Sequence, residues 1–275
     1  MLYCRRFQTS FIERRIALRI IYTDTYQNMS KEAAKILAGQ LWVKPDSVLG
    51  LATGSTPVEL YQNLVWLHEA VGLDFSEATS FNLDEYVGLP ESHPQSYHTF
   101  MAEHLFNHID CPKENIHILN GNAEDLEAEC RHYEEMIREA GGIDLFLGGI
   151  GPDGHIAFNE PGSSLRSRTR VKTLTSDTRI ANSRFFDNDP EKVPAHALTV
   201  GVGTVMDARE VLILANGHHK AEALRAAVEG GITQKWTISA LQMHEHGIIV
   251  CDEAATDKLT VETYKYFKDI EKENL

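Results

Sequence analysis

Short apolar runs rich in β-branched residues alternate along the chain with segments whose apolar positions recur at helical spacing. Seven of the runs predict strands, and several are apolar at nearly every position, as strands buried on both faces should be. They are Leu18–Tyr22, Ser47–Ala52, Thr79–Leu83, Ile143–Ile150, Ala197–Val200, Glu210–Ala215 and Gly247–Cys251. The alternation predicts an α/β fold in which an open, mostly parallel sheet carries helices on both faces.

The segments between these strands carry helix-start signals. Ser30 precedes a helical pattern that extends to about Trp42, and Pro57 predicts the first turn of a helix through Leu67. Further helices are expected at about 96–108, 124–140, 218–229 and 254–271. The stretch at about 161–194 is irregular and too long for an ordinary connection, so we expect a lid or binding loop there. We predict one catalytic α/β domain over residues 18–275, preceded by an N-terminal extension, residues 1–17.

Composition narrows the classes of partner. The net charge of -14 would repel phosphodiester backbones, so no nucleic-acid partner is expected. The four cysteines are far apart and form no CxxC pair, which disfavours a zinc site and a disulfide scaffold. The first residues lack the apolar region and cleavage site of a signal peptide, and no segment approaches the roughly 20 apolar residues of a membrane helix. We therefore expect a soluble, cytoplasmic protein with no membrane partner.

The first chemical signal is the sequence LATGSTP, Leu51 to Pro57, in which a predicted strand ends and a helix begins. Free backbone N–H groups around Gly54, the positive end of the helix dipole and the hydroxyls of Thr53, Ser55 and Thr56 suit one phosphate group. The pattern matches neither a P-loop nor GxGxxG, so it implies no nucleotide. An ordinary β–α turn with a hydroxyl cap explains the same residues.

The second signal is FNLDEYVG, which places Asp84 and Glu85 at the carboxyl end of a buried strand. Ligands of open α/β sheets bind at that edge. Because buried carboxylates are costly to desolvate, one of the two is a candidate general base for a proton α to a carbonyl. Alternation along the chain directs their side chains differently, so only one is expected to face a ligand. The alternative is a solvated acidic cap.

The third signal is GGIGPDGHIAFNEP, from Gly148 to Pro161. Its glycines allow a tight backbone next to a small ligand, and Asp153 or Glu160 could position His155 for proton transfer near neutral pH. The same groups could ligate a metal, but no second histidine lies close in sequence, so we expect no metal. A purely structural role is the other alternative.

Basic residues gather in one region of this acidic chain, where Asp177 is the only nearby acid; they are Arg166, Arg168, Arg170, Lys172, Arg179 and Arg184. Such local positive charge favours anionic ligands. Lys220, at a predicted helix start, could also reach a phosphate as a point charge. A solvated surface position explains any one of these residues taken alone.

Five motifs together, LATGSTP, FNLDEYVGLP, GGIGPDGHIAFNEP, SRTRVKTL and ANSRFFDND, closely resemble the glucosamine-6-phosphate deaminase family, and the likeness extends from about Leu18 to beyond Tyr266. The resemblance implies a modified Rossmann-like fold with no cofactor, and an enzyme that converts glucosamine 6-phosphate and water into fructose 6-phosphate and ammonia. It also implies the family's allosteric bacterial branch, whose members form hexamers activated by N-acetylglucosamine 6-phosphate. The expected partners are these sugar phosphates and further copies of the chain.

The resemblance also assigns roles. Asp84 is expected to move a proton from C2 to C1, and His155 to open the sugar ring while Asp153 and Glu160 hold its orientation. The predicted substrate-binding residues are Thr53, Gly54, Ser55, Thr56, Glu85, Arg184 and Lys220.

Six residues match the family's activator pocket: Ser163, Ser164, Arg170, Lys172, Thr173 and Tyr266. Members of the family usually begin near the position of Leu18, and their terminal amine helps to bind the activator, so the extension here would displace that amine. Two other functions remain open, a 6-phosphogluconolactonase-like hydrolase and a non-catalytic sugar-phosphate sensor. Ammonia release from glucosamine 6-phosphate distinguishes all three.

Overall fold

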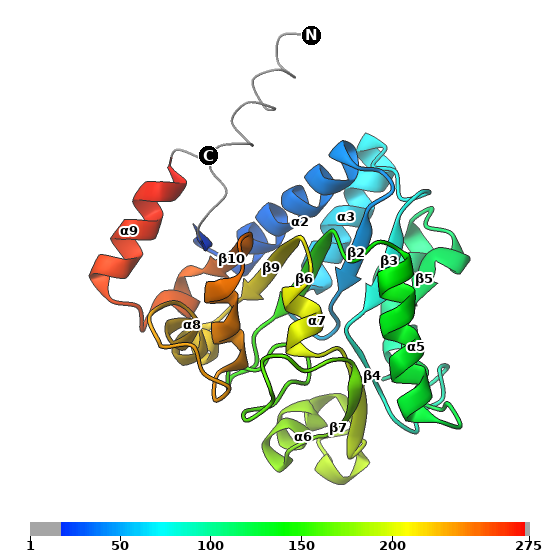
Figure 1. Cartoon of the computed structure of the whole chain (residues 1–275). Helices are drawn as coiled ribbons and strands as arrows, with labels where there is room; N and C mark the ends of the chain where they lie inside the picture. Colours follow the sequence, from blue (N-terminus) through cyan, green and yellow to red (C-terminus); the bar gives the residue numbers. More distant parts are fainter. Residues whose placement is uncertain (1–17, 273–275) are drawn as a thin grey trace.

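The computed structural model describes residues 18–272, and a seven-stranded sheet forms its centre (Figure 1). The strand order is β1-β10-β9-β6-β2-β3-β5, and every neighbouring pair is parallel. The strands are β1 (Arg19–Thr23), β2 (Val48–Leu51), β3 (Thr79–Asn82), β5 (Ile116–His117), β6 (Leu145–Gly149), β9 (Glu210–Ala215) and β10 (Gly247–Asp252). The predicted open parallel sheet is confirmed.

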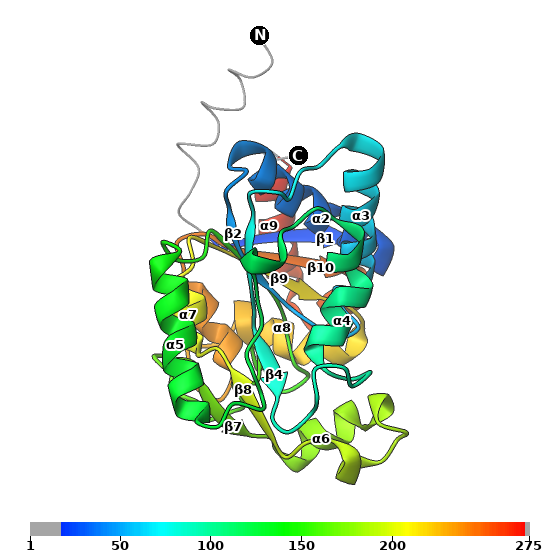
Figure 2. The same ribbon diagram turned by 90° about the vertical axis from the view of Figure 1, so that its right-hand side faces the viewer.

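Helices cover both faces of this sheet, as Figure 2 shows. Alternate residues of a strand enter different cores: in β9, Val211 and Ile213 belong to one and Leu212 and Leu214 to the other. The first core includes α5 (Leu126–Glu139), α7 (Val202–Met206) and α8 (Ala221–Val228), with α9 (Val261–Glu271) packed at its edge; the second includes α2 (Tyr26–Val43), α3 (Val58–Val71) and α4 (Tyr97–His104). Within the described part of the chain, no helix is both long and apolar enough to cross a bilayer.

Two helix starts differ from the prediction. The helix α2 begins at Tyr26, four residues before Ser30, because the Thr25 side chain caps it by accepting the Asn28 N–H at 3.2 Å. Pro57 occupies the N-cap position of α3 rather than its first turn. The additional turn of α2 carries Tyr26 to the loop that precedes α3, since its hydroxyl contacts that loop's backbone.

A second, smaller sheet lies next to the carboxyl ends of the large one. Its order is β4 (Asp84–Tyr86), β8 (His196–Thr199) and β7 (Arg170–Thr173), and both pairs are antiparallel. The predicted strand Ala197–Val200 therefore belongs to this sheet and not to the parallel one. In this sheet Asp84 of β4 lies directly opposite Thr199 of β8. Arg170 of β7 lies opposite the same Thr199 on the other side of β8.

The stretch 161–194 is not irregular as predicted. It contains β7, α6 (Ser176–Asn182) and the short 3₁₀ helices η3 (Ser183–Phe185) and η4 (Pro190–Lys192). Leu174, Phe186 and Val193 form an apolar cluster with Tyr86 and Phe158, so the segment packs on the strand that carries Asp84. The predicted extension, residues 1–17, lies outside the described residues.

Candidate functional site

Four of the predicted segments follow parallel strands, so the sheet itself gathers them at one edge. The loop at Thr53 follows β2, Asp84 follows β3, His155 follows β6, and the 3₁₀ helix η5 (His218–Lys220) follows β9. Because β9, β6, β2 and β3 are adjacent and parallel, their carboxyl ends form a continuous row. The four motifs therefore lie next to one another although up to about 170 residues separate them in sequence.

The loop from Thr53 to Thr56 offers unused backbone donors. No acceptor for the N–H groups of these residues is found within residues 18–272. Gly54 adopts a φ of 91°, a conformation that favours glycine and turns the chain into α3. The Thr56 hydroxyl donates to Asn216 at 3.1 Å. The backbone N–H groups, together with Ser55, are thus the groups best placed to receive an anion.

Two cations belong to this region of the structure, Arg184 beside the loop and Lys220 close enough to respond to its charge. Arg184 of η3 donates to the Ser55 hydroxyl at 3.4 Å, and neither Arg184 nor Lys220 forms an ion pair within the described chain. Burial, followed by the charge of Arg184, lowers the pKa of Lys220 to about 8, while Asp153 opposes the shift. A phosphate dianion would relieve this repulsion and accept hydrogen bonds from both side chains.

The other basic residues do not all join this site. Arg168 forms an ion pair with Asp207 at 2.6 Å, and both side chains are more than half exposed. Arg179 donates to the Pro190 carbonyl at 2.8 Å and so stabilises the segment internally. The predicted basic cluster therefore separates into residues engaged within the protein, Arg168 and Arg179, and others, such as Arg184, that form no ion pair among the described residues.

Asp84 and Glu85 point in different directions, as the alternation predicted. Glu85 accepts hydrogen bonds from the Tyr97 N–H at 2.9 Å and the His98 N–H at 3.2 Å, and its carboxylate lies 2.9 Å from the His98 ring. These contacts cap α4, so the geometry favours a structural role for Glu85 over the predicted substrate contact.

Asp84 is buried, with 7% of its surface exposed, and no hydrogen-bond donor to its carboxylate is found between residues 18 and 272. Burial, together with the negative charge of Glu85, raises the pKa of Asp84 to about 8. A carboxylate with such a pKa is a stronger base than an exposed one, as proton abstraction from carbon requires.

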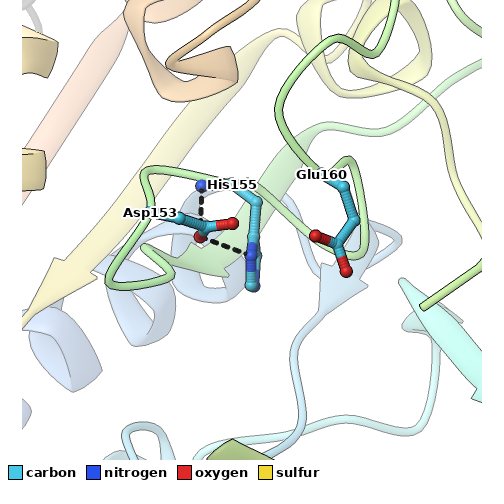
Figure 3. Close-up of side chains that lie close together, drawn as sticks. All are labelled: Asp153, His155 and Glu160. Atoms are coloured by element: carbon cyan, nitrogen blue, oxygen red, sulfur yellow. Dashed lines mark hydrogen bonds and ion pairs between the residues drawn. The ribbon is translucent and has the colours of Figure 1, made fainter. Parts of the chain in front are cut away.

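His155 lies between Asp153 and Glu160, as Figure 3 shows. Its Nδ1 is 2.7 Å from Asp153 Oδ1, which also accepts the His155 N–H at 3.3 Å. Burial opposes ionisation of Asp153, but the hydrogen bond and charge of His155 outweigh it and lower the pKa of that carboxyl. Glu160 accepts hydrogen bonds from the Thr175 N–H at 3.1 Å and the Thr175 hydroxyl at 3.0 Å.

The same three side chains have ligand atoms within 4.8 Å of one another, which is close enough for a divalent cation. The His155 backbone N–H already donates to Asp153 Oδ1, and the Thr175 N–H and hydroxyl donate to the two oxygens of Glu160. This arrangement favours an oriented acid–base histidine over a metal centre.

Thr237 is a supporting residue that the sequence did not reveal. Its hydroxyl accepts the Ile156 N–H at 3.2 Å and donates to the Asn159 carbonyl at 2.9 Å, so it bridges the loop of His155. Trp236 packs against Gly154, where any side chain would collide with the indole ring. No local pattern marks Thr237 as part of the site, because its partners lie about 80 residues away in sequence.

Some of the predicted activator residues lie together. Lys172 donates to the Ser163 hydroxyl at 3.3 Å, and Arg170 and Lys172 project from the same face of β7, next to Thr173. The adjacent Ser164 hydroxyl accepts the Arg166 N–H at 3.2 Å. Tyr266 is 60% exposed on α9, which lies in a different part of the molecule from β7 in both ribbon views (Figures 1 and 2).

Comparison with known proteins places this geometry in a family. The model of the family "Glucosamine-6-phosphate isomerases/6-phosphogluconolactonase" matches residues 23–250. A glucosamine-6-phosphate deaminase of Phocaeicola vulgatus is 66% identical over 263 residues, covering 94% of this chain and all of that protein. One from Porphyromonas gingivalis strain W83 is 60% identical over 263 residues, covering 94% of this chain and all of the relative.

Solved structures agree with this result. A monomeric glucosamine-6-phosphate deaminase matches with a TM-score of 0.85 and 45% identity, covering 86% of this chain and 98% of that one. A 6-phosphogluconolactonase from Trypanosoma cruzi matches with a TM-score of 0.71 at 20% identity, covering 90% of this chain and all of the other, and so shares the fold. The chain belongs to the family of glucosamine-6-phosphate isomerases and 6-phosphogluconolactonases.

Proposed function

We propose that this protein is a glucosamine-6-phosphate deaminase, which converts glucosamine 6-phosphate and water into fructose 6-phosphate and ammonia. Relatives that carry this name are 60–66% identical over most of the chain. The lactonases of the family are far more distant, at 17–22% identity, and support only the fold. The sequence identities therefore favour the deaminase function over the lactonase function.

The observation that carries the proposal is the pairing of two separate acid–base groups with one anion site. Asp84 is a buried carboxyl with a pKa of about 8, and His155 is a histidine oriented by Asp153. The charges of Asp153 and Arg184 both affect the pKa of Lys220. Because Asp153 also contacts His155, the anion site adjoins the histidine. Tyr97 forms a side-chain hydrogen bond with Thr53, and the charge of Asp84 raises the pKa of Tyr97. The Asp84 carboxyl therefore lies near the Thr53–Thr56 loop.

These groups support a two-stage reaction. With the 6-phosphate held by the Thr53–Thr56 loop, Arg184 and Lys220, His155 would transfer the proton that opens the ring. Asp84 would then take the proton from C2 and return it to C1, which leaves an imine at C2 that water hydrolyses to the ketone and ammonia. The substrate's C2 ammonium would favour the ionised form of Asp84 through its opposite charge, so binding would prepare the base.

A regulatory role follows for the remaining predicted residues. Ser163, Ser164, Arg170, Lys172 and Thr173 offer cationic and hydroxyl groups suited to a second sugar phosphate, N-acetylglucosamine 6-phosphate. Since Tyr266 lies apart from them on α9, it would complete that pocket only from another copy of the chain. The proposal therefore includes a homo-oligomer, for which we expect a hexamer. Residues 161–194 would form the lid that joins the two sites.

The deciding experiment is a coupled assay of ammonia and fructose 6-phosphate with glucosamine 6-phosphate as substrate. A deaminase releases the two products in equal amounts. Hydrolysis of 6-phosphogluconolactone without ammonia release would indicate the lactonase function instead. Binding of glucosamine 6-phosphate with no product at all would indicate a sensor.

A further inference from the structure

Tyr26 contacts the anion loop from the side of the first helix. Its ring packs on the core beneath α2 and α3. Its hydroxyl lies 3.2 Å from the Ser55 carbonyl and 3.1 Å from the Thr56 carbonyl, to which it can donate. The same oxygen accepts the Glu59 N–H at 3.3 Å, in the first turn of α3. One hydroxyl group thus connects α2, the loop and the start of α3.

The loop needs such an external contact, because it has little structure of its own. No backbone–backbone hydrogen bond forms among residues 53–56 in the described chain, and Gly54 gives the loop conformational freedom. An unbraced loop would lose that freedom when it bound an anion, which would weaken binding.

The direction of the contact also matters. In a planar trans peptide the carbonyl and the following N–H point in opposite directions. When Tyr26 holds the Ser55 carbonyl, the Thr56 N–H is directed away from Tyr26. That N–H is one of the loop donors with no partner within residues 18–272, and Arg184 reaches the neighbouring Ser55 hydroxyl.

We propose that Tyr26 is a positioning residue for the phosphate of the substrate: its hydroxyl fixes the Ser55 and Thr56 carbonyls so that the loop presents its N–H groups to the anion. The inference rests on the proposed function for the identity of the substrate, although the effect on phosphate itself does not depend on the reaction. The hydrogen bonds of the Tyr26 hydroxyl go to Ser55, Thr56 and Glu59 and not to Asp84 or His155, so the residue should affect binding and not the chemical step.

The test is the Tyr26→Phe variant, which keeps the ring and removes the hydroxyl. We expect KM for glucosamine 6-phosphate to rise about three- to tenfold, the effect of one lost hydrogen bond, with kcat within about twofold of the unaltered enzyme. The affinity for inorganic phosphate, measured by calorimetry without substrate, should fall by a similar factor. The matched control is Tyr22→Phe, because the Tyr22 hydroxyl is buried and has no hydrogen-bond partner among the described residues.

Each outcome decides the question. A selective rise in KM with weaker phosphate binding in Tyr26→Phe, absent in Tyr22→Phe, supports the proposal. Unchanged KM and phosphate affinity, or a fall in kcat at constant KM, overturns it. If the unaltered protein releases no ammonia, the proposed function fails, and the phosphate titration alone then decides the role of Tyr26. Thermal melting of both variants checks that the fold is intact.

Discussion

The proposed catalytic role of Asp84 falls on a carboxyl whose environment opposes its charge. Its pKa of about 8, raised by burial and by Glu85, means that the free enzyme carries this carboxyl largely protonated at pH 7. We therefore expect kcat/KM, which reports ionisation of the free enzyme, to rise with pH and to be half-maximal near pH 8 on its acid side. The corresponding limb of kcat should lie at lower pH, because bound substrate brings an ammonium close to the carboxyl. Initial rates over pH 5–9 measure both limbs, and a flat kcat/KM from pH 6 to 9 would contradict the assignment.

The same pKa predicts a cost in stability. Between about pH 4 and pH 8 the unfolded chain loses the Asp84 proton while the folded chain keeps it, so the free energy of unfolding falls as pH rises. Asp84→Asn removes this dependence. The variant should lose at least about a thousandfold in kcat, yet be more stable than the unaltered enzyme by about 2–5 kcal/mol at pH 8. Urea unfolding at pH 8 and pH 4 measures the difference, and a gain that is equal at both pH values would exclude this cause.

At the scale of whole elements, the sequence predicted best where periodicity was strong. The bounds of β9, Glu210–Ala215, match the prediction, because Val211 to Ala215 form an apolar run buried on both faces. The strands β4, β5 and β7 were missed, because segments of two to four residues with at most one or two apolar or aromatic side chains carry no periodic strand signal. Only pairing with β8 holds β4 and β7 extended. The start of α2 was missed because Ser30 is a plausible cap that the fold instead buries.

The candidate site likewise contains residues that the sequence predicted and residues that it did not. The sequence predicted Asp84, His155 and the Thr53 loop at one edge, because each follows a parallel strand. It could not reveal Tyr26 or Thr237, because a tyrosine or threonine becomes a brace only through contacts across the fold. It also could not reveal that Arg168 pairs with Asp207 and that Arg179 donates to the Pro190 carbonyl, because these partners are not adjacent in the sequence.

The 3₁₀ helix η6 (Thr237–Met243) gives a prediction at this scale, since its first residue braces the His155 loop. Thr237→Val preserves shape but leaves the Ile156 N–H and the Asn159 carbonyl without their hydroxyl partner. We expect kcat to fall about 10- to 100-fold with little change in KM, and the free energy of unfolding to fall by about 1–3 kcal/mol. Thr237→Ser retains the hydroxyl and should recover most of kcat. Steady-state kinetics of both variants is the measurement, and equal losses in the two would point to packing alone.

The largest scale at which the structure makes a prediction is the assembly. Arg170 and Lys172 share a face of β7, whereas Tyr266 is exposed on α9 in another part of the molecule, so one chain does not bring the proposed activator residues together. A structurally similar deaminase is described as monomeric. The oligomeric state of this protein therefore tests whether two chains can share the proposed activator pocket. We expect sedimentation to give a hexamer, and a sigmoidal substrate curve that N-acetylglucosamine 6-phosphate makes hyperbolic.

Substitutions on the two surfaces separate assembly from activation. Lys172→Ala should abolish the response to N-acetylglucosamine 6-phosphate while leaving the maximal rate within about twofold, because the residue lies outside the anion site of the substrate. Tyr266→Ala should weaken the same response, and mixing the two variants should restore part of it, since a Lys172 surface on one chain could then meet an intact Tyr266 on another. Recovery on mixing is the measurement that requires a shared pocket. A single-chain mass with hyperbolic kinetics in both the presence and absence of the activator would instead place this protein with its monomeric neighbour, and α9 would then have no part in regulation.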